Sequence, residues 1–182
     1  MRALASLGRR FIHAEDGSST LEFVIVVPVI MLFLANSVES GVILTRKALL
    51  ERGLDMAVRD LRINTESPPS FAEFRDDICA RTPSIPNCSV SLQVQLTPLK
   101  GDSLNDMLTT INCINSSSVE PDPAELKKGT TYQTGVSNEI MLVRACATYK
   151  PMFPKFGIGA ALPDDESGHY RVAALSAFVQ EP

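Results

Sequence analysis

Residues 17–44 read GSSTLEFVIVVPVIMLFLANSVESGVIL and decide the architecture of this chain. As a helix rising 1.5 Å per residue, the stretch from 23 to 44 would be about 33 Å long, enough to cross a hydrocarbon core of about 30 Å. It therefore predicts one transmembrane helix over residues 23–44, with the lipid bilayer as its surroundings. Pro28 lies inside this helix and has no N–H to donate, so we expect a kink or a local loosening there.

The strictly apolar part of this stretch is short enough to allow a second interpretation. It covers residues 23–35, and the same length is typical of the apolar region of a cleaved secretory signal. Three acids do not suit such a signal, because Glu15 and Asp16 precede the apolar run and Glu22 lies at its edge. A cleavage site of small residues is also missing near its end. A membrane helix is therefore the preferred interpretation.

The second half of the stretch is more polar. It contains Asn36 and Glu39, and a charged side chain at the centre of a bilayer costs at least about 2.5 kcal/mol. Two interpretations of Glu39 stay open: the side chain reaches the membrane interface, or it is buried against a partner. In either case the helix is poorly suited to standing alone in lipid.

An amphipathic pattern continues the helix beyond the apolar run. Four apolar residues recur at helical spacings, namely Leu50, Leu54, Val58 and Leu61. This periodicity predicts one helix from about residue 20 to residue 63, half in lipid and half packed on a head domain. The alternative is a break near Gly41, with a separate short helix after a membrane anchor.

The rest of the chain predicts a small head of mixed helix and strand. Ser70 and Glu73 have the spacing of a capping box and would begin a short helix over residues 70–80. Alternating apolar residues predict strands over residues 89–97, 139–149 and 170–179. The expected fold class is α+β, with a long N-terminal transmembrane and amphipathic helix packed on a small, mainly antiparallel sheet that is held by disulfides.

Two long connections interrupt these strands. Residues 98–134 are polar, and a loop of this length is often functional. Residues 151–168 have the sequence PMFPKFGIGAALPDDESG, which predicts an exposed connection. The acids near its end resemble a solvated turn more than a catalytic pair.

All four cysteines lie in the head: Cys79, Cys88, Cys113 and Cys146. None forms the close Cys-x-x-Cys pair typical of zinc sites, so no metal is expected. In an exported domain they would form two disulfides, each contributing about 2–4 kcal/mol to a modest core. Three pairings are possible. We favour Cys79 with Cys88, between the short helix and the first strand, and Cys113 with Cys146, between the long loop and the second strand. In a cytoplasmic domain they would be reduced core thiols.

The sequence offers no convincing set of catalytic residues. Its only histidines are His13 and His169, and we expect His169 to be exposed in a turn. These do not suffice for a Ser-His-Asp or Cys-His arrangement, and a glycine-rich phosphate loop is missing. The net charge of −4 argues against nucleic acid as a partner. We therefore expect no enzyme activity and no cofactor.

The N-terminal residues resemble those of TadE-like minor pseudopilins of the Tad pilus system, which is of the Flp type or type IVb. The resemblance rests on GSSTLEFVIVVPVIMLFL with its internal Pro28 and on NSVESGVILTRKALLERGLDMAVRDLR, which follows it. The segment FRDDICARTPSIPNCSVSLQVQL and the C-terminal SAFVQEP resemble the family more loosely. SVES at residues 37–40 stands where the family more often has an acid followed by an aromatic residue and glycine.

The resemblance implies a division of the chain and an orientation. Residues 1–17 would be a cytoplasmic leader, residues 18–63 the long helix, and residues 64–182 a periplasmic or extracellular head. The positive-inside rule does not support this orientation, because three basic residues precede the apolar run and five follow it closely. The orientation is retained because the cysteines lie downstream and because the family's leader faces the cytoplasm.

The resemblance also implies a processing step and an assembly contact. A prepilin peptidase would cleave between Gly17 and Ser18, where glycine leaves room at the scissile bond. Glu22, next to Phe23, would then neutralise the free amino group of a neighbouring subunit's first residue. A charge pair that leaves water together costs less than either charge alone.

The function implied by the resemblance is that of a minor pilin that initiates, caps or modifies a Tad adhesion pilus. Its partners would be the prepilin peptidase, other minor pilins, the major pilin and the inner-membrane assembly platform. It would span the bacterial inner membrane once, with its head in the periplasm, and then join the pilus at the cell surface. The alternative is a membrane-anchored periplasmic binding protein that does not polymerise, and an exported enzyme is the least favoured class.

Overall fold

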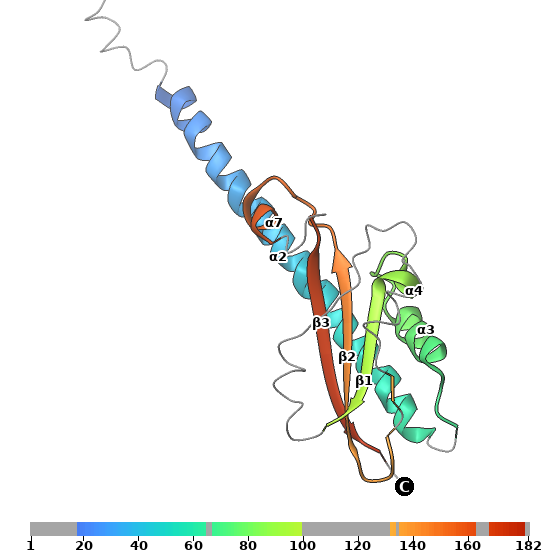
Figure 1. Cartoon of the computed structure of the whole chain (residues 1–182). Coiled ribbons are helices and arrows are strands. Elements are labelled where there is room, and N and C mark those ends of the chain that lie inside the picture. Colours follow the sequence, from blue (N-terminus) through green and yellow to red (C-terminus); the bar gives the residue numbers. More distant parts are fainter. Residues whose placement is uncertain (1–17, 65–66, 100–131, 134, 163–167, 181–182) are drawn as a thin grey trace, which may run out of the picture.

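The computed structural model describes residues 18–64, 67–99, 132–133, 135–162 and 168–180. In this part of the chain a long helix packs along a three-stranded sheet, and its N-terminal half projects beyond the sheet (Figure 1). A shorter helix packs against the same long helix on the side of the first strand. The predicted α+β architecture is therefore confirmed, with its long apolar helix, small antiparallel sheet and disulfide.

Helix α2 spans Ser18–Ile63 without interruption. Its 46 residues correspond to a length of about 69 Å. The helix passes through Gly41, so the alternative of two separate helices is wrong for this structure. Pro28 lies inside the helix, which continues on both sides of it, and the kink expected there stays a prediction.

The sheet has the strand order β1-β2-β3, and both pairs are antiparallel. Its strands are β1 (Leu92–Pro98), β2 (Ile140–Tyr149) and β3 (Tyr170–Val179). The predicted second and third strands agree with β2 and β3 to within a residue. The central strand β2 is buried along nearly its whole length, whereas exposed and buried residues alternate in β3.

A single hydrophobic core joins α2 to the sheet. Ala145 in β2 lies opposite Val94 in β1 and Ala174 in β3, and all three are buried. Because successive side chains of a strand point to opposite faces, alternate residues of each strand enter this core. Helix α2 contributes Leu50, Leu54, Ala57, Val58 and Leu61. The periodicity of the sequence had marked four of these five.

Helix α3, Phe71–Arg81, confirms the short helix predicted over residues 70–80. The Ser70 amide donates to Glu73 Oε2 at 2.8 Å, and the Glu73 amide donates to Ser70 Oγ at 3.4 Å. Of these two bonds, the one from the Ser70 amide to the carboxylate is the main cause that lowers the pKa of Glu73, and the Ser70 side chain adds to this effect. The two bonds also satisfy two N–H groups that a helix N-terminus leaves without a partner. The helix then buries Phe74 and Ile78 in the core.

The first strand begins later than predicted. Residues 89–91 belong to a short helix, α4 (Cys88–Ser91), and β1 follows it directly. The Ser91 hydroxyl donates to the carbonyl oxygens of Pro86, at 2.7 Å, and Asn87, at 3.1 Å. Such local side-chain bonds to the backbone compete with a strand ladder, which accounts for the wrong boundary.

The connection between β2 and β3 is also different from the prediction. It was expected to be exposed throughout, but it contains the short helix α7 (Gly157–Ala161), which packs against α2 (Figure 1). His169, expected to be exposed, is buried with 3% of its surface accessible. Most of the long loop predicted over residues 98–134 lies outside the described residues.

Candidate functional site

The N-terminal half of α2 presents a continuous exposed apolar surface. From Leu21 to Leu34 every residue except Val27 is exposed. This half contains an 18-residue window of mean hydropathy 2.3, none of which is buried. By length and composition α2 is able to cross a membrane. Exposed apolar surfaces of this size mark contact with a membrane or with other proteins.

The residues predicted to direct processing and assembly lie at the tip of this half. The described residues begin at Ser18, which is already helical, and Gly17 lies outside them. Glu22 and Phe23 are both exposed in the first two turns of the helix. This placement leaves them accessible to a peptidase or to a neighbouring chain, and their roles stay predictions.

Glu39 marks the point where the exposed half of α2 ends. Only 1% of its surface is accessible. Its carboxylate accepts hydrogen bonds from the backbone N–H groups of Met152, at 3.1 Å, and Phe153, at 2.9 Å. Of the two interpretations left open by the sequence, burial against a partner is therefore the one observed. The partner is the backbone of the same chain.

Asn36 lies one turn before Glu39 on α2. It binds the connection between β2 and β3 a few residues after Phe153. Its side-chain oxygen accepts a hydrogen bond of 2.7 Å from the Ile158 amide. We name residues 150–162 the strap, because Asn36 and Glu39 bind its backbone at two places.

Two glycines allow the strap to approach α2 this closely. Gly157 has a φ of +57°, and a Cβ there would collide with the side-chain oxygen of Asn36. A Cβ on Gly159 would lie 2.5 Å from the Phe153 carbonyl oxygen and 3.3 Å from Glu39 Oε2. The strap sequence is thus adapted to a close contact with the polar segment of the helix.

Arg46 secures the beginning of the strap two turns after Glu39. Its guanidinium lies 4.7 Å from the centre of the Tyr149 ring, and it donates to the Tyr170 hydroxyl at 2.6 Å and to the Lys150 carbonyl at 3.2 Å. Burial raises the pKa of both tyrosines, and the positive charge of Arg46 offsets part of that rise. Arg46 therefore joins α2 to the adjacent ends of β2 and β3.

The sequence contained a signal for these contacts that the prediction missed. Residues 36, 39, 43, 46, 50 and 54 follow one another at intervals of three or four, so they form one stripe along α2. The apolar end of this stripe was assigned to the core. On the same face, Glu39 is buried and Asn36 and Arg46 are half-buried, and these three side chains make hydrogen bonds where the residues further along make apolar contacts.

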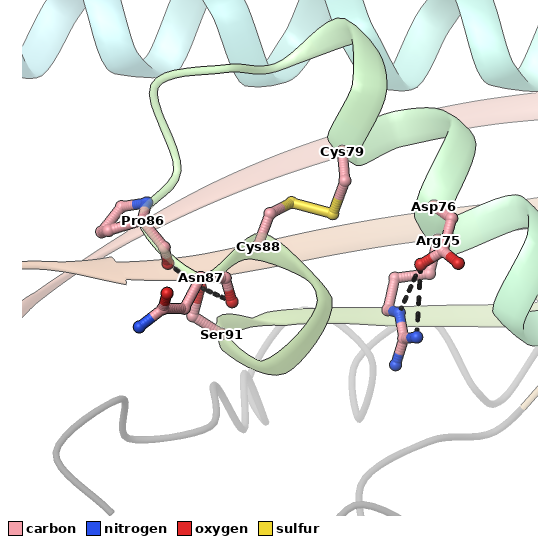
Figure 2. Close-up of a disulfide and its surroundings, with 7 residues drawn as sticks. All are labelled: Arg75, Asp76, Cys79, Pro86, Asn87, Cys88 and Ser91. Atoms are coloured by element: carbon pink, nitrogen blue, oxygen red, sulfur yellow. Dashed lines mark hydrogen bonds and ion pairs between the residues drawn. A yellow bond between two sulfur atoms is a disulfide. The ribbon is translucent and has the colours of Figure 1, made fainter. Parts of the chain in front are cut away.

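The disulfide between Cys79 and Cys88 ties α3 to the short helix before β1 (Figure 2). Their Cα atoms are 5.6 Å apart, and this pairing confirms the one favoured from sequence. Cys146 is buried in β2. Its predicted partner Cys113 lies outside the described residues, so the second pairing stays a prediction.

A charged cluster fixes α3 to the C-terminal part of α2. Arg81 donates to both carboxylate oxygens of Asp77, at 3.0 and 3.1 Å, and its guanidinium also contacts Asp60 of α2. The hydrogen bonds to Asp77 raise the pKa of Arg81, and the charge of Asp60 adds to that rise. Because these groups are partly exposed, they orient α3 more than they stabilise it.

The described residues contain no group of three or more His, Cys, Asp or Glu side chains arranged to hold a metal ion. The features that stand out in the described part of the chain are the exposed apolar half of α2, the segment from Ser18 to Phe23, and the strap that packs where this half ends.

Comparison with known proteins agrees with this emphasis on α2. Residues 17–59 match the family model described as TadE-like protein. The matched region begins at Gly17 and ends within the part of α2 that packs on the sheet. Neither the curated proteins nor the solved structures contain a match.

Proposed function

The chain is TadE-like over residues 17–59, and from this premise we propose that it is a minor pilin of a Tad pilus system. The observation that carries the proposal is that the family match begins at Gly17 and runs through the exposed apolar half of α2. Cleavage between Gly17 and Ser18 would produce a mature chain whose first residues lead directly into that apolar helix.

The exposed half of α2 supports a role in which this helix leaves lipid and packs among other helices. In the membrane, the acyl chains cover its apolar surface; in a pilus, the helices of neighbouring pilins replace them. Glu22 would meet the free amino group of a neighbouring subunit in that environment, and the pairing sets the position of one helix against the next. Both charges then leave water together, which costs less than burying either alone.

The disulfide supports the orientation required by this proposal. Disulfides form and persist in oxidising compartments such as the bacterial periplasm. The bond between Cys79 and Cys88 lies in the head, which favours a periplasmic head and a cytoplasmic N-terminus. In this arrangement the prepilin peptidase, the assembly platform and the other pilins meet the chain at the inner membrane, and the head joins the pilus as a structural part.

Mass spectrometry of the mature N-terminus tests the proposal. We expect the chain to begin at Ser18 in cells that contain a prepilin peptidase and to keep its leader in cells that lack one. Gly17→Val should keep the leader in both, because a branched side chain crowds the scissile bond. Gly8→Val places the same change elsewhere in the leader and should be cleaved normally.

Two results would contradict this assignment. A mature N-terminus at Met1 in peptidase-containing cells would favour the membrane-anchored periplasmic binding protein that does not polymerise. A mature N-terminus near Asn36 would show instead that the apolar run is a cleaved secretory signal.

A further inference from the structure

The strap joins α2 at the height where the helix would emerge from a membrane. From Leu21, the first residue of the exposed apolar run, to Glu39 the helix rises about 27 Å, close to the hydrocarbon thickness of about 30 Å, so this span ends earlier than the one expected over residues 23–44. Asn36 and Glu39 hold the strap at the end of this span. Figure 1 shows α7, within the strap, beside α2 at the end of the sheet from which the helix projects. The strap is therefore adjacent to the membrane surface if α2 spans the bilayer, as the proposed function requires.

The outer side of the strap is unusually apolar for a connection between strands. Four large apolar side chains are 36–53% exposed, namely Met152, Phe153, Phe156 and Ile158. The backbone amides of three of these residues donate to Asn36 or Glu39. The contacts with α2 thus satisfy polar backbone groups, while the apolar side chains remain outside.

The charge of the strap suits the same surroundings. Residues 150–162 contain two lysines and no acid, and Lys150 and Lys155 are both exposed. Aromatic and apolar side chains next to basic residues are typical of segments that lie in the headgroup region of a membrane. On α2, Val38 lies between Asn36 and Glu39 in the sequence and Leu34 shortly before them, and both are also exposed.

We propose that the strap is an interfacial membrane element, whose side chains of Met152, Phe153, Phe156 and Ile158 enter the headgroup region of the leaflet around the outer end of α2. The occupant of this surface is lipid, because the strap is bound to α2 directly after the exposed apolar run that lipid would cover. Since Glu39 and Asn36 join the strap to the helix, the depth at which the strap lies in the leaflet sets the height of the head above the membrane.

The absence of tryptophan from the sequence makes the proposal directly testable. Each introduced tryptophan is the only one in the chain, and its depth is read from quenching by lipids brominated at different acyl positions. Phe156→Trp reports on the strap and Ile30→Trp on the middle of the proposed span. Val136→Trp is the control away from lipid. Val136 precedes β2 and the strap follows β2, so the length of this strand, about 34 Å, separates them.

The full chain would be reconstituted in vesicles of phosphatidylcholine and phosphatidylglycerol. We expect the Phe156→Trp fluorescence to shift to the blue and to be quenched more by shallow bromines than by deep ones. The Ile30→Trp fluorescence should show the opposite depth preference, and that of Val136→Trp should not be quenched.

Each other outcome has a definite meaning. If Ile30→Trp is quenched and Phe156→Trp behaves like Val136→Trp, the strap does not enter the leaflet, although α2 still spans it. A blue-shifted Phe156→Trp without bromine quenching would assign the strap to a protein contact, such as a second copy, and would also overturn the inference. If Ile30→Trp is not quenched either, the membrane span of the proposed function fails as well.

Discussion

Glu39 is the residue that connects the two halves of α2 to the head. Buried carboxylates are tolerated when hydrogen bonds replace the water they lose. Here two backbone N–H groups of the strap do so. The same bonds satisfy two amides that would otherwise lie next to an apolar helix. Removing the charge therefore affects both the helix and the strap.

Glu39→Gln should lower the free energy of unfolding by about 1–3 kcal/mol. Glutamine keeps one oxygen acceptor, but its NH₂ group would face an N–H of Met152 or Phe153 and leave it without an acceptor. Denaturant unfolding in detergent micelles measures the change.

Glu51→Gln is the matched control, because Glu51 lies on the same helix with its side chain 49% exposed beside Lys47. It should change stability by less than about 0.5 kcal/mol. Equal effects of the two substitutions would show that the hydrogen bonds of Glu39 do not stabilise the head.

At the scale of elements, the disulfide holds together the least regular part of the head. It links α3 to α4, and the chain between them contains two prolines and the left-handed residue Asn87, with a φ of 48°. The short helix α4 has four residues and no side-chain cap, so it contributes little stability of its own. The covalent link thus positions the beginning of β1.

Replacing both Cys79 and Cys88 by serine should destabilise the head by about 2–3 kcal/mol, as the closure of a short loop predicts. Denaturant unfolding of the double variant without reductant measures the loss. Wild-type protein treated with reductant should lose at least as much. If the double variant were as stable as oxidised wild type, the link would not position β1.

At the scale of the whole molecule, α2 serves two surroundings with one continuous helix. Its first half has an exposed apolar surface, whereas its second half supplies one side of the head's core. Because one continuous helix joins them, a movement of the first half is transmitted to the head. This coupling suits the function proposed above, in which the helix passes from a membrane into a filament.

Glu22→Ala should reduce recovery of the chain with other pilins by at least about tenfold, because a neighbour's amino group would be buried without its partner. Co-purification from cells that express the Tad components measures recovery. The head should stay folded, as judged by its disulfide-linked peptides.

Glu51→Ala is again the control, since it removes an exposed acid from the other half of the same helix. Unchanged recovery of the Glu22→Ala chain would contradict the pairing role of Glu22.

Local patterns explain most of what was predicted correctly. The length of α2, the capping box of α3 and the alternation in β2 and β3 depend on residues close in sequence, so periodicity and spacing reveal them. The pairing of Cys79 with Cys88 was also accessible, because they are only nine residues apart. The predicted start of β1 was wrong for a local reason too, because the Ser91 hydroxyl bonds to nearby backbone carbonyls. An alternation of apolar residues gives no information about such a bond.

The sequence alone determined that this chain has one long helix, apolar at its beginning and amphipathic afterwards, with a TadE-like motif at its tip. Only the tertiary structure decided the role of the polar segment between the two halves. Asn36 and Glu39 bind amides more than 110 residues away, and no local pattern specifies which distant backbone groups will satisfy a buried side chain. Those contacts depend on the end of β2 and the beginning of β3 lying beside α2, which is a property of the folded molecule.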